Sequence, residues 1–412
     1  MQRRLKKFVT RAIKACFGDE NLSRVQTSYD RIRFQLLHPE YFKLSKKPFD
    51  VLFFCPLSSQ WNNIKLVAEE LIRRRDDLKV GIVTWWRSKE VFPDSFYLMG
   101  NPTIIIQVGF RLNLYNTKII YTPYPGLSPF AIPKNARVVH QLMSMNSLDG
   151  IWPDHHFDAD DYILCGGPHH LDSFRERALR NTFLLGKTLV PAGYPKLDLL
   201  LASHSLKRRP TNASVRAVVY APTHRYSLNE GLVSLCHYGE AIINALLAEG
   251  HRVIFRPHPG SLFDQDRPVI DRICQLHEDN PNFSLDRSED YRESYSLADL
   301  MVTDLSGTGF TFSFGFGRPC IFFSPNTEAE RGLRGIQFEA RHRIGTVVRD
   351  VDEMIDKTSE LCDRNMTDEI ERFRDEAIFN VGKSATYIVD CLEDILSGCE
   401  RPEWVRLRAL QD

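Results

Sequence analysis

Residues 300–323 read LMVTDLSGTGFTFSFGFGRPCIFF, and this stretch decides the fold class. A continuously apolar run ends at Asp304, a turn of small and hydroxyl residues follows, and Arg318 and Pro319 lead into a second apolar run. Runs that are apolar along their whole length are typical of parallel strands covered by helices on both faces, whereas half-solvated strands alternate. The stretch therefore predicts a strand, a turn, a helix at 307–316 and another strand, which is a unit of an α/β fold.

The same alternation continues on both sides of this unit. The expected strands lie at 51–57, 79–85, 103–108, 117–122, 136–141 and 161–165 in the first half, and at 216–222, 251–257, 282–285, 300–304 and 319–323 in the second. Helices are expected at 62–75, 232–249, 265–278 and 290–298, and 351–397 is mainly helical in character. The polar, basic stretch 201–214 has no periodicity and is interpreted as a linker. We expect two doubly wound Rossmann-type domains facing a cleft, at 49–200 and 215–375, with a helical C-terminal tail at 376–412.

Composition excludes several classes of protein. The 412 residues carry 53 basic and 53 acidic side chains, so the formal net charge is zero, which argues against a nucleic-acid partner. The nine cysteines are scattered without CxxC spacing, which favours a reducing compartment and no zinc site. No apolar run reaches the roughly 20 residues of a membrane span, and no secretory signal is recognisable. We expect a cytoplasmic protein.

Residues 1–20 carry a separate signal. The segment MQRRLKKFVTRAIKACF (1–17) has six basic residues and no acid before Asp19, and its apolar residues fall on one helical face. A basic amphipathic helix of this kind can lie on the anionic inner face of the cell membrane. The alternative is a solvated helix packed on the body of the protein.

The turn after the 300–304 strand is the first candidate site. Ser306, Gly307 and Thr308 open a helix directly after Asp304, and a helix N-terminus offers free backbone N–H groups and a positive dipole end to a phosphate or diphosphate. The alternative is an ordinary helix cap, since Ser and Asp favour that position in any protein. The lysine of a Walker motif is absent.

Two further strand exits carry polar residues. IFRPHPG (254–260) holds Arg256 and His258 between two prolines, which fix the backbone, and both side chains can donate to phosphate oxygens. YAPTHR (220–225) places Thr223 and Arg225 after the first strand of the second half, and we expect these two residues and Asp304 to contact the donor in the same cleft. The alternatives are a rigid surface turn and a plain helix-approach loop.

His140 is the candidate general base. It ends an apolar strand in the first half, across the expected cleft, where an imidazole could take a proton from an acceptor hydroxyl. The alternative is a core histidine satisfied by backbone. The histidine pairs at 155–156 and 169–170 lack metal-ligand spacing, so no metal site is expected. No GxSxG, protein-kinase or GxGxxG motif is present, and a nicotinamide cofactor is not expected.

The order of these stretches carries a family resemblance. His140, GYPKLD (193–198), YAPTHR (220–225), RPHP (256–259), TDLSG (303–307) and RPCIFF (318–323) together resemble the CDP-glycerol:poly(glycerophosphate) glycerophosphotransferase family, over about residues 130–390. The resemblance implies a GT-B fold, a first domain for the acceptor, a second for a nucleotide-diphosphate donor, and a peripheral membrane location. It also implies that His140 is the base, that His258 and Arg225 contact the donor, and that Ser306 and Gly307 hold its diphosphate.

This chain departs from the family pattern at two points. The family's Trp-His-Gly is replaced by Val139-His140-Gln141, and its two serines after the aspartate by Ser306-Gly307. We therefore expect a transferase that moves a polyol-phosphate or sugar group from a CDP-linked or similar donor to a polymer or lipid-linked acceptor in cell-surface polymer synthesis. The alternatives are a GT-B glycosyltransferase such as a Kdo transferase, an isomerase like UDP-N-acetylglucosamine 2-epimerase, and a non-catalytic sugar-nucleotide-binding protein. No cofactor beyond the donor substrate is expected.

Overall fold

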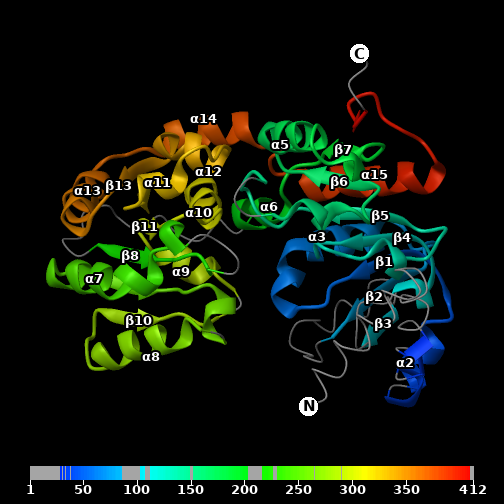
Figure 1. The fold of residues 1–412 in the computed structure, drawn as a ribbon, viewed down its shortest axis with the longest axis horizontal. Helices are drawn as coiled ribbons and strands as arrows, with labels where there is room; N and C mark the ends of the chain where they lie inside the picture. The colour runs from blue at the N-terminus through cyan, green and yellow to red at the C-terminus, as the bar shows by residue number, and fades with distance from the viewer. Residues whose placement is uncertain are drawn as a thin grey trace.

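The computed structural model describes residues 28–29, 31–32, 34–37, 39–85, 103–106, 112–148, 152–202, 216–225, 230–263, 265–288 and 290–408. They form two α/β bodies side by side, each built on one sheet (Figure 1). The predicted basic helix at 1–20 and most of the predicted linker lie outside these residues. The expected class, two doubly wound α/β domains of GT-B type with a helical C-terminal region, is confirmed.

The first sheet has eight strands in the order β14-β7-β6-β5-β4-β1-β2-β3, and all neighbours are parallel except β14 and β7. Its strands are β1 (Pro48–Phe54), β2 (Val80–Thr84), β3 (Thr103–Ile106), β4 (Asn116–Thr122), β5 (Arg137–Gln141), β6 (Tyr162–Cys165), β7 (Thr188–Pro191) and β14 (Val405–Arg406). Its helices are α2 (Pro39–Leu44), α3 (Ser58–Arg74), α5 (Pro168–Ala178) and α6 (Pro195–Ala202), with a 3-10 turn, η4 (Asp154–Phe157). One face packs against α3, and the other against the segment around η4 and α5.

The second sheet has six parallel strands in the order β10-β9-β8-β11-β12-β13. They are β8 (Ala217–Tyr220), β9 (Arg252–Phe255), β10 (Phe283–Leu285), β11 (Leu300–Thr303), β12 (Cys320–Phe323) and β13 (Gly345–Val348). The helices are α7 (Leu235–Ala248), α8 (Arg267–Leu276), α9 (Arg292–Leu297), α10 (Thr308–Phe316), α11 (Thr327–Glu330), α12 (Ile336–Glu339), α13 (Val351–Asp363) and α14 (Thr367–Ala377), with 3-10 turns η7 (Pro259–Leu262) and η8 (Arg341–Arg343). Because parallel strands all end at one edge, the segments after β8, β9, β10 and β11 lie next to one another.

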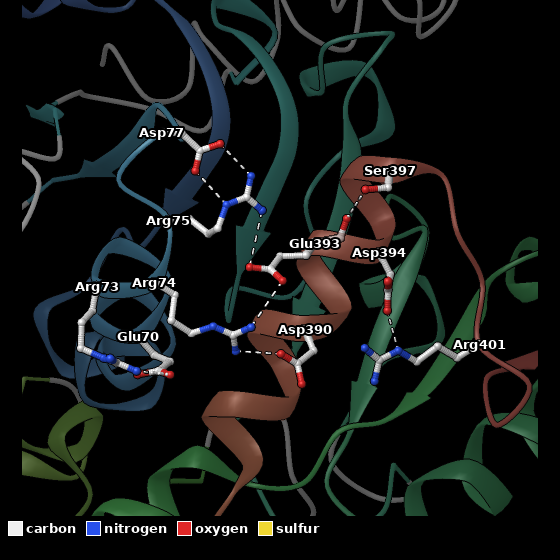
Figure 2. Close-up of polar contacts among 10 residues, drawn as sticks. All are labelled: Glu70, Arg73, Arg74, Arg75, Asp77, Asp390, Glu393, Asp394, Ser397 and Arg401. Carbon is white, nitrogen blue, oxygen red and sulfur yellow. Dashed lines mark hydrogen bonds and ion pairs between the residues drawn. The ribbon is translucent and has the colours of Figure 1, made fainter.

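The C-terminal segment returns to the first sheet. Helix α15 (Ser384–Ser397) packs beside α3, and its buried Ile388 and Leu392 share a core with Ile64. Figure 2 shows the polar side of this contact: Arg74 pairs with Asp390 at 2.7 Å and with Glu393 at 3.4 Å. The tail is not wholly helical, since β14 adds an antiparallel strand to the edge of β7. The chain therefore crosses between the two bodies twice.

The two segments that cross between the bodies are hydrogen-bonded to each other. The carboxylate of Asp198, on α6, accepts hydrogen bonds from the backbone N–H groups of Gly382 (2.8 Å) and Ser384 (2.6 Å) at the start of α15. Gly193 has a positive φ of 92°, and a Cβ there would lie 2.3 Å from the carbonyl oxygen of Phe379. Glycine is therefore required where the outgoing and returning segments touch. Of the helices in the described part of the chain, none is long and apolar enough to cross a bilayer.

Candidate active site

The turn between β11 and α10 is the first of the predicted anion sites. Gly307 is the residue before the helix, and the Oγ of Ser306 accepts a hydrogen bond from the backbone N–H of Thr308 at 3.2 Å. The first N–H groups of a helix have no acceptor within it, and the dipole of α10 places its positive end here. The N–H groups of Thr308 and Gly309 both bond to Ser306, as in an ordinary helix cap, and phosphate binding at this turn stays a prediction.

Asp304 lies just before this turn but is fully occupied. It is 2 % exposed, and its oxygens accept from the N–H groups of Thr223 (2.9 Å), Ser234 (2.8 Å) and Leu305 (2.8 Å) and from the hydroxyls of Thr223 and Ser234. The carboxylate thus ties the segment after β8 to the turn after β11. This geometry favours a positioning role for Asp304 and Thr223 over the predicted direct contact with the donor, because the carboxylate has no free edge and would repel phosphate.

His258 and His224 stand together at the exits of β9 and β8. Their rings are 5.5 Å apart between centroids and tilted by 31°. The Nδ1 of His258 accepts a hydrogen bond from the backbone N–H of Gly260 at 3.0 Å. An accepting Nδ1 requires the proton of a neutral imidazole to sit on Nε2, so His258 presents a donor there. That donor suits a phosphate oxygen.

The two arginines predicted to bind donor are each tethered to an aspartate. Arg256 pairs with Asp286 and donates to the backbone carbonyl of Ser288 at 2.9 Å. Arg225 lies 2.8 Å from Asp266, which is 1 % exposed. Their charges are largely matched within the protein, so both arginines are held in place at strand exits without leaving a large unpaired charge.

The first body reaches over the turn through residues 142–148, the loop after β5. The side-chain amide of Asn146 donates to the backbone carbonyl of Leu305 at 3.1 Å, and the Oδ1 of Asn146 is buried without a partner. A Cβ at Gly307 would lie 2.6 Å from the Oγ of Ser144 and 2.8 Å from that Oδ1. Glycine at 307, where the family pattern has a second serine, fits this close approach.

His140 is separated from the turn. It lies on β5, is 2 % exposed, packs edge-on against Phe157, and its Nδ1 is 3.2 Å from the Oδ2 of Asp160. Burial raises the pKa of the Asp160 carboxyl, while His140 opposes that rise. The pair resembles a base and its orienting carboxylate in composition, with Nε2 left for proton transfer. No described contact joins His140 to the second body, and its burial equally fits the alternative of a core histidine.

One histidine of the second pair, His170, has structural partners at both ring nitrogens. The Nδ1 of His170 accepts from the N–H of Gly166 at 3.0 Å, and its Nε2 lies 2.9 Å from the carbonyl oxygen of Asn146. His170 therefore supports the loop that covers the turn. Within the described ranges, no group of three or more His, Cys, Asp or Glu side chains is arranged to hold a metal ion.

Sequence reasoning did not single out two residues, Lys196 near Arg256 and Tyr295 at the start of α10. The ammonium of Lys196, in GYPKLD, lies over the ring of Tyr291 at 4.5 Å from its centroid. The hydroxyl of Tyr295 hydrogen-bonds the Oγ1 of Thr308, the first residue of α10. The only signal in the sequence was the position of Lys196 directly after a strand and a Gly-Tyr-Pro turn.

Comparisons with known proteins agree with this architecture. The chain is 25% identical over 246 residues to the teichoic acid poly(glycerol phosphate) polymerase of Bacillus spizizenii, a match that covers 56% of this chain and 58% of that protein. This chain thus spans little more than half the length of that curated relative, and 27% of a second one, from Bacillus subtilis.

Solved structures are similar in fold. The wall teichoic acid polymerase TagF aligns with a TM-score of 0.61 and 14% identity over 91% of this chain and 98% of its own, and a TagF variant has also been solved after a soak with CDPG. The UDP-GlcNAc 2-epimerase of Methanocaldococcus jannaschii aligns with a TM-score of 0.57 and 12% identity over 84% of this chain and 99% of its own.

A match to a sequence profile shows to which family this chain belongs. The profile of the CDP-glycerol:poly(glycerophosphate) glycerophosphotransferases matches residues 154–394, which include the turn after β11, the exits of β8 and β9, and most of α15. Because the profile matches more than half of the residues of this chain, the chain belongs to the CDP-glycerol:poly(glycerophosphate) glycerophosphotransferase family.

Proposed function

We propose that this chain is a transferase that moves glycerophosphate from CDP-glycerol to a hydroxyl of a polymer or lipid-linked acceptor in cell-surface polymer synthesis. The observations that carry the proposal are the turn of Ser306, Gly307 and Thr308 at the start of α10, and His258 at the exit of β9, whose Nδ1 accepts a hydrogen bond and whose proton therefore lies on Nε2. Family membership supports the choice of donor.

The reaction follows from these groups. The acceptor oxygen would attack the glycerol-bearing phosphorus, the bond from that phosphorus to the bridging oxygen would break, and CMP would leave with the bridging oxygen. The α10 turn and His258 would stabilise the negative charge that grows on the phosphates, which is where preorganised donors lower a barrier most. His140, oriented by Asp160, is the proposed acceptor of the hydroxyl proton at Nε2.

The isomerase alternative has less support at this site. An epimerase of sugar nucleotides needs carboxylates free to act on the sugar. The described carboxylates beside the turn are engaged, Asp304 by five hydrogen bonds and Asp286 by Arg256. A GT-B glycosyltransferase would use the same turn, so only the donor separates it from the proposal.

A donor assay tests the proposal. The purified protein is incubated with CDP-glycerol, CMP-Kdo or UDP-N-acetylglucosamine, with and without an acceptor-bearing lipid fraction, and both nucleotide release and isomerisation of the sugar nucleotide are measured. We expect CMP release from CDP-glycerol that depends on the acceptor. Turnover of CMP-Kdo alone would make the chain a glycosyltransferase, and acceptor-independent conversion of the UDP-sugar would make it an isomerase.

The base assignment needs its own variant. His140→Gln should lower kcat by about 10²- to 10⁴-fold, the usual contribution of a general base, while the unfolding midpoint stays close to that of the wild type. His237→Gln, on the exposed side of α7, is the matched control. Full activity of His140→Gln would leave His140 as a core residue.

We also propose that residues 1–20 hold the protein on the inner face of the cell membrane. Exposed apolar side chains continue beyond that segment in the described part of the chain, with Ile32 59% and Leu36 75% exposed. Flotation with vesicles that contain anionic lipid should retain the wild type. Binding should be lost when the basic residues are replaced by Gln, at Arg3, Arg4, Lys6, Lys7, Arg11 and Lys14. Equal flotation of both proteins would remove this proposal.

A further inference from the structure

The ammonium group of Lys196 has no ion-pair or hydrogen-bond partner among the described residues. It lies in the first turn of α6, the helix that packs against both α3 and α10. Its side chain is partly buried, and among the described residues no carboxylate or carbonyl oxygen lies within ion-pair or hydrogen-bond distance of its Nζ. The contact it does make is with the face of the Tyr291 ring.

The electrostatic surroundings of Lys196 are positive. Burial, and then the charge of Arg256, lower the pKa of Lys196 to about 8. Arg256 is itself paired with Asp286, whereas nothing among the described residues offsets the charge of Lys196. A partly buried ammonium beside a guanidinium is unfavourable unless an anion joins it.

Tyr291 adds a second group without a partner. It is 8 % exposed, and its hydroxyl is buried with no hydrogen-bond partner. A buried hydroxyl of this kind is uncommon in a folded protein and calls for a ligand or an ordered water. Its ring packs on Tyr295 at 5.0 Å between centroids, and the Tyr295 hydroxyl bonds Thr308 at the start of α10. A short line of contacts therefore joins Lys196 to the anion-binding turn.

The packing of α6 on α10 also brings their first turns together. A Cβ at Gly315, near the end of α10, would lie 2.9 Å from the Cδ1 of Leu200, near the end of α6. Tyr194, just before α6, lies close to Thr311 in α10, whose side chain opposes the rise that burial causes in the pKa of Tyr194. The two helices therefore run in the same direction, and the Lys196 end of α6 lies beside the Thr308 end of α10.

We propose that Lys196 and Tyr291 bind the diphosphate of the nucleotide donor from the α6 side of the site, facing the turn at the start of α10. The ammonium neutralises one phosphate and the Tyr291 hydroxyl donates to a phosphate oxygen. During transfer the ammonium also meets the charge that passes to the leaving CMP. The inference rests on the proposed function, since it places a residue within that site.

Binding measurements on four variants test it. Isothermal titration with CDP compares the wild type with Lys196→Met, Lys196→Arg, Tyr291→Phe and the control Lys118→Met, whose lysine pairs with Asp50 at the other end of the first sheet. We expect Lys196→Met to weaken CDP binding by about 10- to 100-fold, the size of a lost charged hydrogen bond. Lys196→Arg should retain most of the affinity, Tyr291→Phe should lose a smaller part, and Lys118→Met should lose none.

The thermal unfolding midpoint distinguishes a ligand-binding lysine from a lysine with a structural role. Without ligand, Lys196→Met should unfold at a higher temperature than the wild type, because an uncompensated charge is removed. A lysine that holds the fold together would give a lower midpoint with unchanged CDP affinity, and that result would overturn the inference.

Two further ligands separate this inference from the proposed function. UDP and inorganic pyrophosphate are titrated against the same proteins. If the wild type prefers UDP, the cytidine donor is wrong, but loss of UDP binding in Lys196→Met still supports the lysine. If Lys196→Met binds every phosphate ligand as the wild type does, the inference fails while the donor assignment stands. If the wild type binds none of them, both fail.

Discussion

The side-chain amide of Asn146 donates to the backbone carbonyl of Leu305 at 3.1 Å, which joins the loop after β5 to the turn after β11. One residue belongs to the first sheet's body and the other to the second. The same loop places Ser144 and Asn146 directly over Gly307. The turn proposed to bind the donor is therefore covered by the other half of the protein, and a larger side chain at residue 307 would limit how closely the two halves approach.

Gly307→Ala should lower kcat/KM for the donor by about 10²-fold, the cost of misplacing a site by roughly an ångström. Gly307 has φ −60°, so alanine is compatible with the backbone, and the defect comes from the Cβ that would lie 2.6 Å from the Oγ of Ser144. Steady-state kinetics measure the loss. Ser144→Ala and Asn146→Ala in the same chain should restore part of the activity, and an unrescued defect would place the cause elsewhere.

Asp304→Ala should destabilise the fold by about 3 kcal/mol, because it leaves buried donors of Thr223, Ser234 and Leu305 unsatisfied. Denaturant unfolding measures the change. Asp363→Ala is the matched control: Asp363 pairs with Arg216 at 2.8 Å but its side chain is 77% exposed, and such pairs contribute about 0–1 kcal/mol. Equal effects of the two substitutions would contradict a bracing role for Asp304.

The strands that the sequence predicted are those with long apolar runs. The prediction at 117–122 corresponds to β4 (Asn116–Thr122), and that at 319–323 to β12 (Cys320–Phe323). β7 (Thr188–Pro191) and β13 (Gly345–Val348) were not predicted. Each strand is short, and its few apolar residues lie next to Thr, Pro or Gly. Such strands are specified by pairing with a neighbour, as β13 pairs with β12, and a local pattern does not contain that partner.

The candidate site, like the fold, was predictable only in part from the sequence. Ser306, His258 and Thr223 were predicted from their position after a strand, and parallel strands bring those positions to one edge. The roles within that edge depend on contacts between distant residues. The pairing of Lys196 with Tyr291 and the approach of Asn146 to Leu305 join segments about a hundred residues or more apart, and the burial of His140 depends on Phe157 and Asp160. None of these contacts has a local signature.

His258→Asn and His258→Gln should differ in activity. Asparagine can still accept the hydrogen bond from Gly260 but has no group at the position of Nε2, so we expect kcat/KM to fall by about 10²-fold, as when one transition-state donor is removed. Glutamine can place an N–H near Nε2 and should lose less. Steady-state kinetics with CDP-glycerol make the comparison, with His237→Asn as the exposed control. A larger loss in His258→Gln than in His258→Asn would mean that the Gly260 bond, rather than Nε2, is what matters.

Acid stability should depend on His170. Burial lowers the pKa of His170 from 6.5 to about 4, against the opposing effect of hydrogen bonds to the backbone of Asn146 and Ser144. Since the unfolded chain then binds more protons than the folded one between these two values, stability is lost as pH falls from about 6.5 to about 4, by at most about 3 kcal/mol.

His170→Gln removes the titrating group and keeps a donor for the carbonyl of Asn146. We expect it to be less stable than the wild type near pH 8, by about 1–2 kcal/mol, because the N–H of Gly166 loses its acceptor. Between pH 6.5 and 4, however, its unfolding free energy should fall less steeply, because its residue 170 takes up no proton on unfolding. Urea unfolding at several pH values gives both quantities, and the exposed His237→Gln should keep the wild-type slope. An unchanged slope in His170→Gln would assign the acid sensitivity to other buried groups, His169 first among them, since burial lowers its pKa well below the ordinary value.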